Sequence, residues 1–96
     1  MTLVRWTPQA ADDLQAIYDF IARDSPHYAQ LTVESIIAAI DHLEQFPLMG
    51  RHVPERERED LRELIKPPYR IVYRVSDAVK ILTIFRGSRL FPSEFE

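Results

Sequence analysis

Four arginines in the second half of the chain, Arg70, Arg74, Arg86 and Arg89, are spaced so that they could meet at one site. They lie in, or just after, two strand-like stretches joined by a short link, and a hairpin would bring them together. Convergent guanidinium groups can hold a phosphate backbone, stabilise a phosphoryl transition state, or receive the carboxylates of an acidic partner peptide. The residue types alone leave these three uses open.

Catalysis at RNA would need a general acid and a general base beside such arginines. The histidines, His27, His42 and His52, are scattered over predicted helices and a loop, and none falls in the predicted strands that carry the arginines. The sequence has no cysteine, no pair of histidines at a metal-ligand spacing, no glycine-rich phosphate loop and no nucleophile motif. We therefore expect no metal site and no cofactor.

Charge is divided unevenly along the 96 residues, which we interpret as a single domain over residues 1–96. Residues 1–50 contain two Lys or Arg against seven Asp or Glu, whereas residues 51–96 contain ten against eight. The net charge of −3 argues against an extended or sequence-specific nucleic-acid interface. No apolar run is long enough to span a membrane and the first residues do not resemble a signal peptide, so we expect a cytoplasmic protein without a membrane partner.

Start signals and apolar periodicity predict an α+β fold with the order β-α-α-β-β-β. A short strand at 2–6 precedes two amphipathic helices, which begin at Pro8 and Pro26 after the capping residues Thr7 and Ser25. The second helix should end near residue 46, and a loop with the charged run 55–60 should follow as a solvated connection. Three strands are then expected at 60–66, 68–76 and 79–87. Two helices joined by a short turn would form a hairpin on one face of an antiparallel sheet.

Strand alternation assigns the arginines to the face that the helices leave open. If Ile71 and Tyr73 face the helices, then Arg70, Val72 and Arg74 face away from them. The following strand is apolar on both sides, and its Leu82 and Ile84 would join the arginines. Apolar side chains beside arginines on an open sheet face indicate that a partner covers that face.

Several stretches in the same order resemble the RelE/ParE superfamily of bacterial toxins. They are WTPQAADDLQAIYDFIA, FPLMGR, LRELI, PYRIVYRV and VKILTIFRGSRLFP, which together cover almost the whole chain. The resemblance implies the toxin of a type II toxin–antitoxin pair, whose cognate antitoxin wraps a C-terminal segment over the toxin. On this basis we expect the antitoxin to contact Arg70, Val72, Arg74, Leu82 and Ile84.

Two activities are found in this superfamily, and the residues resemble its ParE side more closely. ParE-like members poison DNA gyrase without being nucleases, whereas RelE-like members are ribosome-dependent ribonucleases. The resemblance to RelE would give catalytic roles to Arg70 and Arg89, but the tyrosine of that pattern falls on or near Phe95, which has no hydroxyl. ParE relatives often have a histidine where this chain has Arg86.

We therefore expect a non-enzymatic, ParE-like gyrase poison. Its target contacts would be Arg86, Arg89, Leu90 and Phe91. A RelE-like ribonuclease and an inactive toxin-like module that only binds antitoxin are the alternatives.

Overall fold

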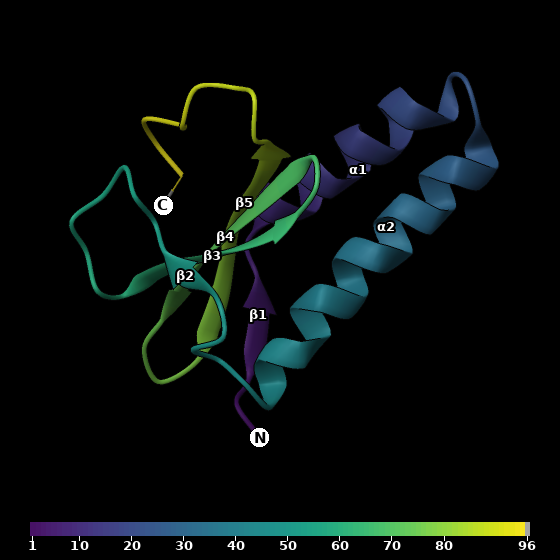
Figure 1. The fold of residues 1–96 in the computed structure, drawn as a ribbon. Coiled ribbons are helices and arrows are strands. Elements are labelled where there is room, and N and C mark those ends of the chain that lie inside the picture. Colours follow the sequence, from purple (N-terminus) through teal and green to yellow (C-terminus); the bar gives the residue numbers. More distant parts are fainter. Residues whose placement is uncertain (96) are drawn as a thin grey trace.

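The computed structural model describes residues 1–95, in which a hairpin of two helices packs on one face of a five-stranded sheet (Figure 1). The predicted α+β class and the order of the helices and main strands are confirmed. The elements are β1 (Val4–Trp6), α1 (Pro8–Ala22), α2 (Pro26–Asp41), the 3-10 turn η1 (His42–Glu44), β2 (Arg51–His52), β3 (Leu61–Lys66), β4 (Tyr69–Val75) and β5 (Val79–Arg86).

Both helices begin where the sequence predicts. The Thr7 side chain accepts a hydrogen bond from the backbone N–H of Ala10 at 3.1 Å, and Ser25 accepts one from Tyr28 at the same distance. A proline occupies the first helical position in each case, where its missing N–H costs nothing. Thr7 also donates its hydroxyl to the Ile81 carbonyl of β5 at 2.8 Å, so this cap fastens the start of α1 to the sheet.

The sheet is mixed rather than wholly antiparallel. Its order is β1-β5-β4-β3-β2, and β3, β4 and β5 form the predicted antiparallel meander. The N-terminal strand β1 instead pairs parallel with β5, at the edge left free by the meander. The predicted loop contains one further strand, β2, whose two residues pair with β3.

A β-bulge in β5 changes which side chains face the helices. Val72 pairs with Thr83 and the next residue of β4, Tyr73, pairs with Ile81, so Leu82 has no partner on β4. An extra residue shifts the alternation of a strand by one position. Ile84 consequently lies in the core beneath the helices, 2 % exposed. Its predicted place on the opposite face is wrong.

The main core fills the space between the helical hairpin and the sheet. It is built from helix residues such as Ile36 and Ile40 and from strand residues such as Ile71, Tyr73 and Ile81. These side chains are almost fully excluded from water. The predicted inward set of β4 therefore faces the helices as expected.

A second, smaller core lies on the other face of the sheet, which the sequence predicted to be open. Its buried residues are Val53, Leu61, Val72, Leu82 and Phe85. Phe91 and Phe95 from the segment after β5 pack against them, and the loop between β2 and β3 runs on the same side (Figure 1). The chain itself thus covers the face that we expected a partner to cover.

Candidate functional site

Arg70 lies on this second face and is bound by two carboxylates. Its Nε donates to Oε1 of Glu63 at 2.6 Å, while Nη1 and Nη2 donate to the two carboxylate oxygens of Glu55 at 2.8 Å each. This is the bidentate fork typical of strong arginine–carboxylate pairs. The side chain of Arg70 is only 10 % exposed. The predicted solvated connection is therefore anchored at Glu55.

Glu63 is the fully buried member of this ion network. Its side chain has no exposed surface, and its second oxygen accepts a hydrogen bond from Nε of Arg51 at 2.6 Å. Two guanidinium groups therefore compensate one buried charge. The hydrogen bonds that Arg70 donates to Glu55, together with its hydrogen bond to Glu63 and the negative charges of both, raise the pKa of Arg70 above its usual range. The hydrogen bond from Arg70 lowers the pKa of Glu55.

Aromatic rings close the remaining sides of Arg70. Its guanidinium carbon lies 5.3 Å from the ring centres of both Phe85 and Phe91. Phe91 meets Phe85 and Phe95 edge to face, with ring centres 5.8 and 5.5 Å apart. Arg56 adds a second cation over the ring of Phe91. A phosphate could reach Arg70 only by displacing Glu55 or the aromatic segment.

The five side chains predicted to contact an antitoxin do not form one accessible surface. Arg70, Val72 and Leu82 are buried under the chain's own loop and C-terminal segment, and Ile84 faces the helices. Arg74 stays partly exposed, across from Lys80 in β5. The prediction of an open apolar face is wrong, because the sequence does not show that the residues after β5 fold back over it.

The side chains predicted to contact a target differ in how far they are exposed to solvent. Arg86, Arg89 and Leu90 are exposed, and Leu90 keeps 94 % of its surface. Phe91 is half-buried in the second core, where it covers Phe85. Their role at a target stays a prediction, and Phe91 has a structural role as well.

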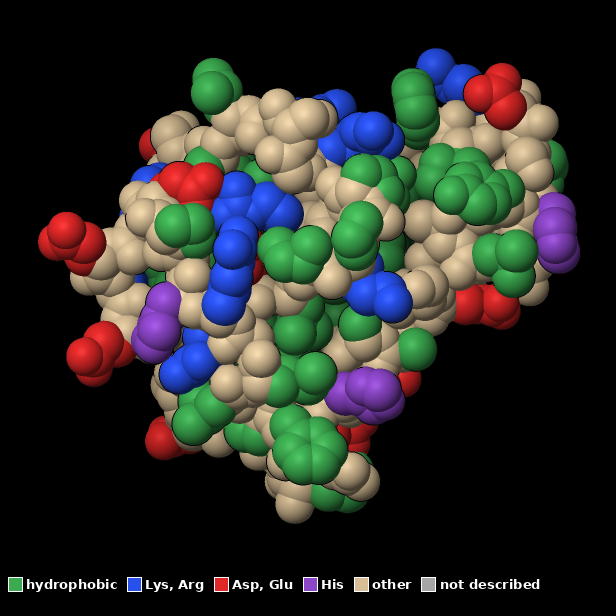
Figure 2. All heavy atoms as spheres, in the orientation of Figure 1, with side chains coloured by type: hydrophobic (Ala, Val, Ile, Leu, Met, Phe, Trp, Pro, Cys, Tyr) green, Lys and Arg blue, Asp and Glu red, His purple; other side chains and the backbone are tan. Residues whose placement is uncertain are grey.

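A groove of about 460 Å³ lies where the end of β5 meets the second half of α1. We call it the basic groove. Among the residues that line it are Phe20, Arg23, Tyr69, Arg86 and Arg89. The guanidinium of Arg86 lies 5.9 Å from the ring centre of Tyr69, and that of Arg23 lies 5.7 Å from that of Phe20. Figure 2 shows basic side chains gathered on this upper part of the molecule.

The sequence reasoning missed Phe20 and Arg23. Phe20 departs from the apolar stripe of α1 and is 61 % exposed. A large apolar side chain on the polar side of an amphipathic helix was the available signal. Predicting the groove would also have required knowledge of the bulge, because the bulge turns Arg86 toward the side of the sheet where Ile84 and α1 lie.

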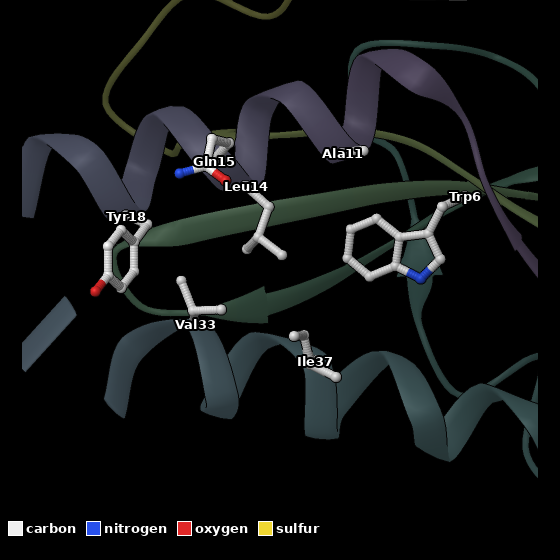
Figure 3. A pocket seen from close by; sticks show the side chains of 7 residues that line it. All are labelled: Trp6, Ala11, Leu14, Gln15, Tyr18, Val33 and Ile37. Carbon is white, nitrogen blue, oxygen red and sulfur yellow. The ribbon is translucent and has the colours of Figure 1, made fainter. Parts of the chain in front are cut away.

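A second hollow, apolar and about 480 Å³ in volume, lies between the two helices. Figure 3 shows Leu14 and Tyr18 of α1 pointing toward Val33 and Ile37 of α2, with Trp6 of β1 at one end. We call it the interhelical groove. Leu14, Tyr18 and Val33 are only half-buried there.

Tyr73 of β4, whose residue type could serve acid–base chemistry, is enclosed by the fold. Tyr73 is buried, donates its hydroxyl to the Pro47 carbonyl at 2.9 Å, and accepts from the Gly50 N–H at 2.9 Å. Burial raises the pKa of Tyr73. Among residues 1–95, no group of three or more His, Asp or Glu side chains is placed to hold a metal ion. No helix in the same part of the chain is long and apolar enough to cross a membrane.

Comparisons with known proteins place this fold among the toxins of bacterial toxin–antitoxin systems. Two solved structures superpose on nearly the whole chain: a chromosomal ParDE toxin–antitoxin system from P. aeruginosa and the RelBE2 toxin–antitoxin complex from Mycobacterium tuberculosis. The first has a TM-score of 0.74 and 32% identity, covering 90% of this chain and 96% of that one. The second has a TM-score of 0.59 and 27% identity, covering 88% and 96%.

Sequence comparison gives the family. Residues 4–91 match the model of the ParE toxin of the type II toxin–antitoxin system parDE. Toxin RelE2 of Caulobacter vibrioides is 40% identical over 92 residues, which cover 94% of this chain and all of that protein. The chain therefore belongs to the ParE toxin family of type II toxin–antitoxin systems, within the wider ParE/RelE superfamily.

Proposed function

We propose that this toxin acts by binding DNA gyrase and not by cleaving RNA. The observation that carries the proposal is the state of Arg70, which a RelE-like mechanism would use at the scissile phosphate. Three of its N–H groups are bonded to Glu55 and Glu63, and its side chain is buried. A group held in this way stabilises the fold and is not presented to a substrate.

The surface proposed for gyrase is the exposed end of β5 and the segment that follows it. Arg86, Arg89 and Leu90 are accessible there, beside the basic groove. Arginines with nearby apolar side chains are typical anchors of protein interfaces. The family model that matches residues 4–91 is that of a ParE toxin, and the ParE side of the superfamily is the one that the resemblance links to gyrase.

A supercoiling assay tests this proposal. Purified toxin, freed of antitoxin, should abolish supercoiling by gyrase or accumulate cleaved DNA. The double variant Arg86→Ala/Arg89→Ala should lose roughly tenfold or more in potency, because exposed anchors are removed while no buried side chain is replaced. Arg58→Ala, which removes an exposed arginine at Asp60, is the matched control.

Two results would contradict gyrase as the target. Ribosome-dependent cleavage of messenger RNA with gyrase activity intact would favour the ribonuclease alternative. Normal growth on induction without antitoxin, with neither activity detected, would favour the inactive binding module.

We also propose that the cognate antitoxin binds along the interhelical groove. The solved ParDE and RelBE2 structures are of toxin–antitoxin systems, which supports a protein partner of this kind. The groove presents half-exposed apolar side chains from both helices, which suit the apolar stripe of a partner helix. The apolar side chains predicted for the open sheet face, Val72 and Leu82, are buried, and Arg74 stays partly exposed beside them.

Charge substitution in the groove tests this site. Ile37→Glu should weaken antitoxin binding about tenfold or more in calorimetry, because a carboxylate would replace apolar contact area at the groove. Ile37 is 36% exposed, so the free toxin should fold normally. Leu31→Glu changes a residue of α2 outside this groove and should bind as the unmodified toxin does. Equal affinity of both variants would remove the interhelical groove as the antitoxin site.

A further inference from the structure

We infer that the basic groove binds an acidic, apolar peptide segment of the toxin's target, an inference that rests on the proposed action by binding a protein. The occupant would be a stretch whose carboxylates lie on Arg23, Arg86 and Arg89. One of its apolar side chains would enter beside Phe20. The groove, its charges and its exposed ring each support part of this inference.

The arginines of this groove are not engaged by the chain's own carboxylates. Within residues 1–95, Arg23, Arg86 and Arg89 form no ion pair, and all three are exposed. Arg70 and Arg51, by contrast, are bound to glutamates. Arginines left without an internal carboxylate partner around one hollow can form bidentate bonds to carboxylates from another molecule.

The two aspartates in the wall of the groove are used by the fold. Asp13 accepts hydrogen bonds from the Thr83 hydroxyl at 2.6 Å and from the Ile84 backbone N–H at 3.0 Å. Asp13 thereby gives a hydrogen-bond partner to a backbone N–H on the edge of β5, beyond the point where β1 ends. Asp19 accepts from the amide of Gln15 at 2.9 Å. The arginines outnumber these carboxylates, although α1 belongs to the acidic half of the chain.

A peptide suits this groove better than a nucleic acid does. A nucleic acid carries a negative charge at every nucleotide, so its phosphates would lie near Asp13 and Asp19 as well as near the arginines. The net charge of the protein, −3, also disfavours a nucleic acid. A peptide can place carboxylates only opposite the arginines. The exposed ring of Phe20 adds apolar surface that such a segment would bury.

A defined probe tests the groove separately from the identity of the target. The probe is a fluorescein-labelled synthetic peptide of alternating Glu and Leu, compared by anisotropy with its Lys–Leu counterpart and with oligothymidylate. The unmodified toxin should bind the Glu–Leu peptide, and Arg23→Glu, Arg86→Glu or Arg89→Glu should each weaken it about tenfold. Arg5→Glu is the matched control, since it reverses an exposed arginine on β1 outside the groove.

The outcomes distinguish the groove as a peptide-binding site from gyrase as the target. Loss of peptide binding in the groove variants alone supports the inference, and parallel loss of gyrase inhibition extends it to gyrase. Peptide binding that depends on the groove, with gyrase untouched by the unmodified toxin, keeps the inference and removes gyrase as the target. The inference is overturned by equal weakening in Arg5→Glu, by the absence of Glu–Leu binding, or by tighter binding of oligothymidylate.

Discussion

Gly50→Ala should destabilise the toxin by about 3 kcal/mol or more, although it adds a single methyl group. A Cβ at residue 50 would lie 2.5 Å from the hydroxyl oxygen of Tyr73 and 2.6 Å from the backbone oxygen of Glu63. Neither can move readily, because Tyr73 is fully buried and bonded at its hydroxyl and Glu63 is held in β3. Thermal and urea unfolding would measure the loss.

Gly87→Ala is the matched control for that substitution. The nearest atoms to its added Cβ are the Pro68 carbonyl oxygen at 3.5 Å and side-chain carbons of Arg70 at 3.6 Å, which are ordinary contacts. We expect a change within about 0.5 kcal/mol. Equal stability of the two variants would show that the segment around residue 50 can shift away from Tyr73.

Arg70→Met should cost about 3–5 kcal/mol, because among residues 1–95 it leaves the buried carboxylate of Glu63 with Arg51 as its single ionic partner. For a domain of this size the melting temperature would fall by roughly 15 °C or more. Any loss of toxicity in this variant should then follow the loss of folded protein. A folded, equally stable Arg70→Met that lost RNA cleavage would instead indicate a catalytic arginine.

Two companion variants separate the buried pair from the exposed one. Arg70→Met/Glu63→Leu removes both buried charges and should recover most of the stability lost in Arg70→Met. Glu55→Gln should cost less than about 1 kcal/mol, because its side chain is 37% exposed and its pair with Arg70 is screened. The pKa of Glu55 is lowered in the folded state, so its contribution is complete at neutral pH and is lost as the pH falls through that lowered value.

Local signals in the sequence were sufficient for most of the fold. Thr7–Pro8 and Ser25–Pro26 marked the helix starts because capping is decided by adjacent residues. The three main strands followed from apolar runs and from turns between them. The parallel pairing of β1 with β5 could not be predicted in this way, because it joins segments more than seventy residues apart.

The candidate site was harder to predict, for three physical reasons. Alternation assigns faces only while a strand is regular, and the unpaired Leu82 breaks it before Ile84 and Arg86. Glu63 resembles an ordinary surface residue in the sequence, since its partners, Arg51 and Arg70, come from two other strands. Phe91 and Phe95, which cover the second face, lie in a segment without regular secondary structure, so no periodic pattern indicates where they pack.

The bulge in β5 also means that this strand can lose one residue without turning its far end over. Loss of the single codon for Leu82 would leave Ile81 opposite Tyr73 and Thr83 opposite Val72, so every later side chain would keep its face and Arg86 would stay in the basic groove. The second core alone would change, because Leu82 is one of its buried residues. Loss of Phe85, beyond the bulge, would instead move Arg86 to the opposite face, so two single-codon deletions in one strand should have different effects on the groove.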